Sequence, residues 1–510
     1  MIKPAKKDFL LSANAGSISP VYWEIPYSPA HQVYESFISP NSFLLESVKG
    51  PENIARYSFI GFAPYLTFKV KDGTVEINTK DKRAVSSANP LSRLKSLVDA
   101  YRQAPLKALP PFQGGAVGLL SYDFVRYLEK LPKTTKDDLK IPDAHFFMID
   151  KLIAFDHKKK KAWIIVCPGT RDTELGYGDV DVDWAEKYDE AEDEIQKISV
   201  RVSECQSSKE NLPPPSPPWQ GGDKGEVQGE DRRGSISSLK HGLSKEQYMD
   251  MVKRAKEYIA AGDIFQINLS LRVSAEIGKT NPWSLYKILR SINPSPFAGY
   301  IDFGDYQIVS SSPERLLKIS GGVIETRPIA GTRPRGGDIK EDELMRTELL
   351  LNEKERAEHI MLIDLERNDI GRVSDYGSVH VNELMITEDY SHVIHIVSNV
   401  KGKLASEKTC FNAIKAAFPG GTITGVPKVR CMEIIDELES VSRGPYTGSF
   451  GYIGFSGSMD LNIVIRTFVI KDGFAYVQAG AGIVADSDPE NEYYESLKKA
   501  EALIRTLERA

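Results

Sequence analysis

Residues 352–359 read Asn-Glu-Lys-Glu-Arg-Ala-Glu-His, and within them Glu355 and Glu358 lie three positions apart. The same spacing returns near the C-terminus at Glu492 and Glu495. On a helix, side chains three positions apart share one face, so each pair would present two carboxylates in the same direction. Two such faces across a cleft would suit a Mg²⁺ ion that keeps several waters and also binds a substrate. A solvated helix face would give the same pattern for either pair alone, so the interpretation depends on the neighbouring motifs.

Two glycine-containing loops in the same half are candidate ligand-binding segments. The loop at 419–428 leads into a predicted helix, whose free backbone N–H groups would face a carboxylate or phosphate. A tight turn that needs a positive φ is the alternative for this loop. The loop at 327–336 contains Gly331 and Thr332, which could approach a ligand through backbone and hydroxyl.

A third loop, 479–486, follows a predicted strand and is built of small residues, among them Gly480 and Gly482. Small residues in this position allow another group to come close to the backbone. The loop leads into the helix that carries the second carboxylate pair, and Lys499 follows on the same helical face. A surface ladder of ion pairs would show the same spacing.

Three further side chains could complete such a site. His395 lies in a strand-like alternation that could direct it into the cleft as a proton-transfer group. A hydrogen-bonded core histidine is the alternative. Tyr446 and Arg466 add a hydroxyl and a guanidinium on neighbouring predicted strands, and arginine favours bidentate binding of a carboxylate.

Composition indicates a soluble cytoplasmic enzyme with a small substrate. The 510 residues are 41% hydrophobic and 27% charged, with a formal net charge of -6 and no long basic patch, which argues against a nucleic-acid binder. No apolar stretch is long enough to cross a membrane, and the N-terminal apolar run is too short for a signal peptide. The cysteines are far apart, so neither a disulfide framework nor a zinc site is expected: Cys167, Cys205, Cys410 and Cys431.

One segment, 207–238, is rich in proline, glycine and charge and poor in apolar residues. Such a segment is expected to be a linker or surface insertion, because it cannot bury enough apolar surface to offset the entropy of ordering. It divides the chain into predicted domains at 1–206 and 239–510.

Periodicity predicts a mixture of short strands and helices on both sides of this segment. A capping box, formed by Ser244 and Gln247, predicts the start of a helix that ends at Gly262. The predicted strands are 57–60, 66–70, 161–166, 266–272, 297–303, 307–311, 316–319, 323–327, 449–455, 463–470 and 475–479. The other predicted helices are 91–101, 180–198, 342–364, 409–417, 428–438 and 489–507.

Taken together, the motifs resemble the chorismate-utilising family that includes anthranilate synthase component I and aminodeoxychorismate synthase component I. The matching runs are EKERAEHIMLIDLERNDIGRV (353–373), PIAGTRPRG (328–336), PGGTITGVPK (419–428), GPYTGSFGYI (444–453), IVIRT (463–467), AGAGIVADSDPE (479–490), QGGAVG (113–118) and LLES (44–47). They are long and specific, and they extend over nearly all the chain except the linker.

The resemblance implies an α+β fold: two interlocked domains of β-sheets sandwiched together, with helices packed outside. It also implies an active site for Mg²⁺ and chorismate in the C-terminal part. Glu358 and Glu495 resemble the metal ligands, and Glu355 and Glu492 support them. Lys499 resembles the cleft lysine of the family. The implied substrate-binding residues are Gly331, Thr332, Tyr446, Arg466, Gly480 and Gly482, and the groups near the ring hydroxyl and the enolpyruvyl side chain are Thr422 and His395.

Family members take ammonia from a glutamine amidotransferase subunit. A separate partner is expected here, because no cysteine of the chain lies in a nucleophile-elbow setting. At four sites the chain looks more like the aminodeoxychorismate enzymes than like the anthranilate synthases: Asn268, 313–315, Gly420–Gly421 and 460–466. Ala330 argues for anthranilate, because many aminodeoxychorismate synthases have a nucleophilic lysine there.

Two other functions are weighed against these. A catalytically silent ligand-binding regulator is disfavoured, because the carboxylate pairs, His395, Thr422 and Arg466 are all present. Isochorismate formation is disfavoured, because no water-activating lysine is evident.

A candidate effector pocket lies in the first half of the chain. The motif at 44–47 with the run at 56–58 resembles the tryptophan pocket of feedback-inhibited anthranilate synthases, and it also occurs in the sister enzyme. The pocket would comprise Leu45, Glu46, Ser47, Arg56 and Tyr57.

Overall fold

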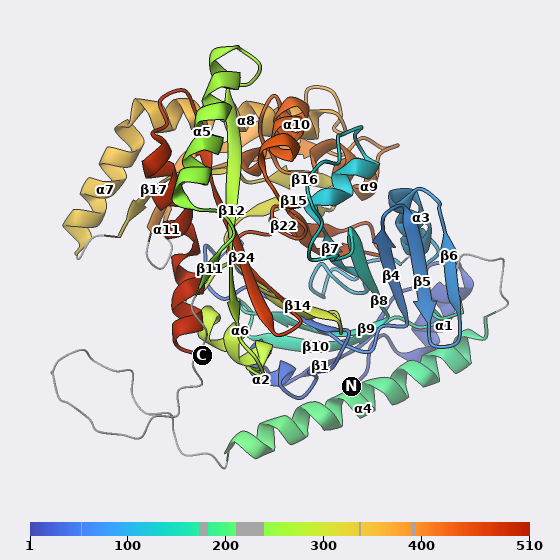
Figure 1. The fold of residues 1–510 in the computed structure, drawn as a ribbon. Helices are drawn as coiled ribbons and strands as arrows, with labels where there is room; N and C mark the ends of the chain where they lie inside the picture. Colours follow the sequence, from blue (N-terminus) through green and yellow to red (C-terminus); the bar gives the residue numbers. More distant parts are fainter. Residues whose placement is uncertain (53, 102, 173–181, 211–238, 336–337, 390–392) are drawn as a thin grey trace, which may run out of the picture.

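The structure is a computed structural model that describes residues 1–510 except 53, 102, 173–181, 211–238, 336–337 and 390–392. Within the described residues the chain forms two twelve-stranded antiparallel sheets, and the helices lie around them (Figure 1). The α+β class predicted from the sequence is confirmed.

The strands of the first sheet follow one another in the order β1 (Val21–Ile25), β10 (Lys161–Val166), β9 (Lys151–Asp156), β3 (Tyr57–Gly61), β2 (Ser42–Glu46), β13 (Phe297–Asp302), β14 (Tyr306–Ser312), β23 (Thr467–Lys471), β24 (Phe474–Ile483), β12 (Gln266–Glu276) and β11 (Lys240–His241), with β20 (Gly425–Val426) beside β12. The order in the second sheet is β17 (Ile329–Pro334), β19 (Val393–Lys403), β16 (Val323–Thr326), β15 (Arg315–Ser320), β22 (Met459–Asn462), β21 (Ser449–Gly454), β7 (Gly115–Leu120), β8 (Ala144–Ile149), β4 (Leu66–Lys71), β5 (Thr74–Thr79) and β6 (Arg83–Ser86), with β18 (His380–Asp389) beside β19.

Each sheet takes strands from both sides of the predicted linker. In the first sheet β2 pairs with β13, and Leu45 lies opposite Gly299. In the second sheet β7 pairs with β21, and Gly118 lies opposite Gly451. The two halves are therefore interlocked, as the resemblance implies, while their division at 1–206 and 239–510 stays a prediction.

An aromatic core lies between the two sheets. It contains Phe43 and Ile301 from the first sheet and Phe147 and Phe450 from the second, all buried. Buried aromatic side chains remove large apolar areas from water, so this layer binds the sheets together. One polar contact also crosses it, between His145 Nδ1 on β8 and the Tyr306 hydroxyl on β14 at 3.2 Å.

Helices cover the outer faces. They are α1 (Lys6–Asn14), α2 (Ala30–Tyr34), α3 (Pro90–Asp99), α4 (Trp184–Glu210), α5 (Lys245–Ala260), α6 (Pro282–Ile292), α7 (Ile339–Leu351), α8 (Glu353–Gly371), α9 (Cys410–Ala417), α10 (Lys428–Leu438) and α11 (Pro489–Glu508), with short 3₁₀ turns η1 (Tyr122–Tyr127) and η3 (Gly421–Ile423). The capping box predicted at Ser244 and Gln247 is present at the start of α5, and Gly262 follows the helix with φ +81°. Asp488 caps α11, with Pro489 in its first turn.

Two predicted elements are corrected by the structure. The helix predicted at 342–364 is two helices, because Asn352 leaves the helical conformation and accepts a hydrogen bond from the Glu355 N–H at 3.0 Å. The strand predicted at 463–470 begins only at Thr467, since Arg466 has φ +51°, outside the extended region.

The predicted helix at 180–198 and the predicted linker fall partly outside the described residues. Residues 180–181 lie outside them, and α4 begins at Trp184. The helix continues to Glu210, so the first four residues assigned to the linker are helical, while 211–238 lie outside the described residues.

No helix in the described part of the chain is both long and apolar enough to cross a membrane. Cys167, Cys410 and Cys431 are buried free thiols.

Candidate active site

Helices α8 and α11 bring the two predicted carboxylate pairs together. Glu358 lies close enough to Glu355, Glu492 and Glu495 to be affected by their charges. Burial raises the pKa of Glu358, and these three neighbours raise it further, against the opposing charge of Lys354. Burial and the charge of Glu495 likewise raise the pKa of Glu492. The other three carboxylates of α8 and α11 thus lie within electrostatic range of Glu358.

This acidic cluster fits a cation that binds through few protein ligands. In the described part of the chain no three His, Cys, Asp or Glu side chains form a preformed metal cage, and Lys499 Nζ lies 2.9 Å from Glu495 Oε1. Mg²⁺ commonly binds one or two carboxylates and completes its shell with water and substrate oxygens, so it does not need such a cage. Mutual repulsion of the carboxylates favours a bound cation.

One carboxylate oxygen of Glu355 is buried without a hydrogen-bond partner among the described residues, which leaves it available to a ligand. Its Oε1 accepts an ion-paired hydrogen bond from Arg333 at 2.6 Å, whereas Oε2 is the buried oxygen. Gly331 lies against this oxygen: a Cβ there would be 2.4 Å from Oε2, and φ is +68°. The positive φ favours glycine at 331, and a Cβ there would also displace the Glu355 carboxylate.

The small residues of β24 form one wall of the site. Gly480 pairs with Ser270 and Gly482 with Asn268 on β12. A Cβ on Gly480 would lie 2.4 Å from the Leu269 carbonyl oxygen, and one on Gly482 would lie 2.7 Å from Gln266 Nε2. The Lys499 ammonium donates a 3.1 Å hydrogen bond to the Gly480 carbonyl oxygen, so α11 and this wall are connected directly.

His395 lies at the inner end of this site. It is opposite Thr332 in the pairing of β17 with β19, and its Nδ1 is 3.3 Å from the Gly331 carbonyl oxygen. Burial, and then the positive charges of Arg466 and Lys499, lower the pKa of His395 to about 3. His395 is therefore a neutral imidazole near pH 7 in this chain.

Glu314 is a site residue that the sequence did not single out as functional. It is buried, and its Oε1 accepts a hydrogen bond from the Thr422 hydroxyl at 2.8 Å. Burial raises the pKa of Glu314 to about 7, with Glu366 raising it and Arg466 and Lys499 lowering it. Glu314 therefore holds its proton about half the time near neutral pH. The sequence offered only the run Pro313–Arg315, and burial of an acid is not visible in such a run.

The glycine loop already faces an anion from the protein itself. Gly421 lies in η3, and its N–H donates to the buried carboxyl group of Glu366 on α8. Burial and the charge of Asp369 raise the pKa of Glu366. A Cβ on Gly421 would also lie 2.0 Å from Leu365 Cδ2, so close helix packing explains this glycine. What the loop adds to the site is the Thr422 hydroxyl.

The two remaining predicted substrate contacts flank the strand β23. Arg466 is near enough to influence both Glu314 and His395 electrostatically. Tyr446 lies in the turn before β21, where burial raises its pKa, and it lines the same small cavity as Thr467 and Gln478.

The predicted effector residues lie on or next to β2 and β3 and make several separate polar contacts. Arg290 donates to both oxygens of Glu46 at 2.8 and 2.9 Å, and Tyr286 donates at 2.7 Å. Burial would raise the pKa of Glu46, but hydrogen bonds from His31 and Arg290 lower it to about 2. Arg56 pairs with Asp156 at 2.8 Å and lies over the Tyr57 ring. Leu45 is half-buried, and the Ser47 hydroxyl donates to the Pro296 carbonyl oxygen at 3.0 Å.

Comparison with known proteins identifies the family. A family model described as chorismate binding enzyme matches residues 40–505, and the chain belongs to this family. Anthranilate synthase component 1 of Acetivibrio thermocellus is 44% identical over 469 residues, which cover 92% of this chain and 90% of that protein. Aminodeoxychorismate synthase component 1 of Bacillus subtilis (strain 168) is 43% identical over 465 residues, 91% of each.

A solved structure gives the same result. Anthranilate synthase component I from Streptococcus pneumoniae TIGR4 is 38% identical, has a TM-score of 0.72, and is matched over 88% of this chain and 92% of its own. The two kinds of synthase are almost equally similar to this chain, so identity alone does not distinguish the product.

Proposed function

We propose that the chain catalyses the Mg²⁺-dependent amination of chorismate to 4-amino-4-deoxychorismate, with ammonia from a glutamine amidotransferase partner, in the cytoplasm. One observation carries this proposal: Lys499, which pairs with Glu495 of the carboxylate cluster on α8 and α11, also lowers the pKa of a buried acid, Glu314, that burial raises to about 7. The carboxylate cluster suits a cation bound to a substrate carboxylate, and the buried acid suits protonation of a leaving hydroxyl.

The residues of the chain would have the following roles. Glu358, Glu492 and Glu495 would hold Mg²⁺, which when bound withdraws electron density from the ring carboxylate of chorismate. Arg466 and Lys499 would attract the dianion, and Tyr446 would donate a hydrogen bond to it. Gly480 and Gly482 would approach the substrate through their backbone, because the positions that side chains would take there are filled by Leu269 and Gln266 of β12.

Proton transfer falls to Glu314, with Thr422 holding its carboxyl group at 2.8 Å. As the ring C–O bond breaks, Glu314 supplies the proton and the hydroxyl leaves as water. Ammonia forms the new C–N bond and releases a proton, for which the Glu314 carboxylate is the acceptor. Ala330 offers no amine, so the amination proceeds without a covalent bond to that position.

Support for this product comes from four sites at which the chain resembles aminodeoxychorismate synthases: Asn268, 313–315, Gly420–Gly421 and 460–466. Two of these positions belong to the candidate site, because Asn268 faces Gly482 across β12 and β24 and Glu314 lies in the second run. Anthranilate is the second candidate, favoured by Ala330.

The test is to incubate the chain with chorismate, Mg²⁺ and ammonium at alkaline pH, where free ammonia replaces the partner. Fluorescence is followed with and without an added aminodeoxychorismate lyase. We expect little fluorescence from the chain alone and 4-aminobenzoate once the lyase is present. Rapid anthranilate fluorescence without lyase would overturn the proposed product, and unchanged chorismate would overturn the proposed activity.

A further inference from the structure

Arg443 is a buried arginine whose hydrogen bonds reach three separate segments around the site. It follows α10, and its side chain is 1% exposed. Its guanidinium donates to the carbonyl oxygen of Ile423 in the glycine loop at 2.9 Å and to that of Asn268 on β12 at 2.7 Å. A third bond, 3.2 Å long, goes to the Thr447 hydroxyl in the turn before β21.

The ring faces of two tyrosines enclose the same guanidinium. Its central carbon lies 4.9 Å from the centre of the Tyr122 ring and 5.6 Å from that of Tyr446. Both distances are within the range of a cation–π contact. Arg443 thus donates hydrogen bonds to the residue after Thr422 and the residue after Tyr446, and it contacts the Tyr446 ring. None of these hydrogen bonds goes to a group that is proposed to bind chorismate.

Glu439 provides the balancing charge and extends the network. Arg443 Nε and Nη2 donate to its two oxygens at 3.0 and 2.8 Å. The same carboxylate accepts hydrogen bonds from the Ser270 N–H at 3.0 Å and its hydroxyl at 2.8 Å. Ser270 in turn accepts one from Gln478, two residues before Gly480.

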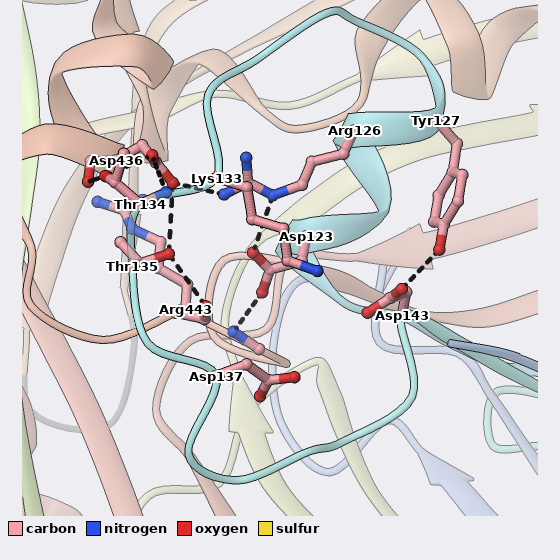
Figure 2. Close-up of polar contacts among 12 residues, drawn as sticks. Asp123, Arg126, Tyr127, Lys133, Thr134, Thr135, Asp137, Asp143, Asp436 and Arg443 are labelled. Atoms are coloured by element: carbon pink, nitrogen blue, oxygen red, sulfur yellow. Dashed lines mark hydrogen bonds and ion pairs between the residues drawn. The ribbon is translucent and has the colours of Figure 1, made fainter. Parts of the chain in front are cut away.

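A neighbouring ion pair offers a natural comparison (Figure 2). Arg126 of η1 pairs with Asp436 on α10 at 2.5 Å, and Asp436 also binds the N–H and hydroxyl of Thr134. Asp436 lies three residues before Glu439. Both arginines therefore neutralise an acid at the same end of α10, but the bonds described for Arg126 connect it with η1 and α10 rather than with the glycine loop or β12.

We infer that Arg443 is a positioning residue that fixes the glycine loop, β12 and the Tyr446 turn relative to one another. In this arrangement Thr422 keeps its hydrogen bond to Glu314, and Tyr446 faces the substrate. The inference deepens the proposed function and rests on it. A forked guanidinium is needed, because one ammonium cannot reach carbonyl oxygens on two segments while also pairing with Glu439. Without that fork, two buried carbonyl groups lose their donors, which favours movement of the loop.

The test compares Arg443→Lys and Arg443→Met with Arg126→Met in the full chain. We expect both Arg443 variants to lose about 100-fold or more in kcat, since small misplacements of catalytic groups cost this much. The Arg126→Met protein should keep a kcat near that of the wild type, although its melting temperature falls about as much as in the Arg443 variants. An equal kcat loss in Arg126→Met, or a full kcat in folded Arg443→Lys, would overturn the inference.

The pH profile separates positioning from general destabilisation. The Thr422 hydrogen bond lowers the pKa of Glu314, which also faces Glu366 on α8, Arg466, and Lys499 on α11. Losing that bond should shift the alkaline limb of kcat to higher pH in the Arg443 variants alone. An unshifted limb would count against the inference.

Hydrogen exchange keeps the result independent of the proposed activity. The Thr424 and Asn268 amides are hydrogen-bonded at 3.2 and 2.9 Å to the Gly421 and Thr424 carbonyl oxygens. We expect these amides to exchange at least tenfold faster in Arg443→Met than in Arg126→Met, whether or not chorismate is turned over. Equal exchange in the two variants would overturn the inference and leave the proposed function intact.

Discussion

The proposed proton chemistry depends on the carboxyl group of Glu314. Its pKa of about 7 is raised by burial, so the protonated acid is present below this pH and is lost above it. Because the concentration of free ammonia changes with pH, the rate must be compared per unit of free ammonia. We predict that kcat normalised in this way falls as pH rises through about 7. Glu314→Gln should lose about 10²- to 10⁴-fold in kcat. A flat profile or an active Glu314→Gln protein would remove Glu314 from its role.

The acidic cluster makes a second prediction for single residues. Glu358→Gln and Glu492→Gln should each raise the Mg²⁺ concentration needed for half-maximal rate at least about tenfold, because even outer partners of a metal site cost 10- to 100-fold. Glu501→Gln on the same helix α11 is the control, since Glu501 pairs with Lys498 and Arg505. A magnesium titration with circular dichroism of each variant decides the matter; unchanged Mg²⁺ dependence in both cluster variants would contradict the assignment.

At the level of elements, the first turn of α8 decides where Glu355 and Glu358 point. Asn352 ends α7 and caps α8 through its bond to the Glu355 N–H. Asn352→Ala should therefore destabilise the fold by about 1 kcal/mol, and Asn352→Asp, which keeps the acceptor, should not. Urea unfolding measures both. Equal stability of the Ala and wild-type proteins would mean that the cap is not what holds this turn.

At the level of the whole molecule, both sheets depend on strands from the two halves of the chain. A fragment of residues 239–510 would expose the edge of β13 that binds β2 and the edge of β21 that binds β7. We predict that this fragment does not melt cooperatively alone and that coexpression with residues 1–210 restores a cooperative melt.

Deletion of 211–238 is the control for that experiment. It leaves both sheets whole, and loop length affects stability only logarithmically, so the melting temperature should change little. A cooperative melt of 239–510 alone would contradict the interlocked account. A large decrease in the melting temperature of the deletion variant would contradict it as well.

Local signals in the sequence predicted local structure well. The capping box at Ser244 and the two carboxylate pairs depend on residues a few positions apart. The break at Asn352 was missed because strong helix formers flank it on both sides. The late start of β23 was missed because a positive φ at Arg466 is rare for arginine and leaves no mark in composition.

Features that depend on contacts between residues far apart in the chain could not be predicted from local sequence patterns. The pKa of Glu314 comes from burial among α8, α11 and the glycine loop, and the role inferred for Arg443 comes from carbonyl groups on two other segments. The pairing of β2 with β13 joins residues about 250 positions apart in the chain, which no local pattern specifies. The family resemblance implied specific roles for the site residues, which the local motifs left open.

The most direct test of the central claim is the ratio of pyruvate released to chorismate consumed by the chain with Mg²⁺ and ammonium alone. Amination to 4-amino-4-deoxychorismate keeps the enolpyruvyl group, whereas anthranilate formation expels it as pyruvate. The account predicts a ratio near zero, rising towards one pyruvate per chorismate only after a lyase is added. A ratio of one without the lyase would contradict it, and so would no consumption of chorismate at saturating Mg²⁺ and ammonium.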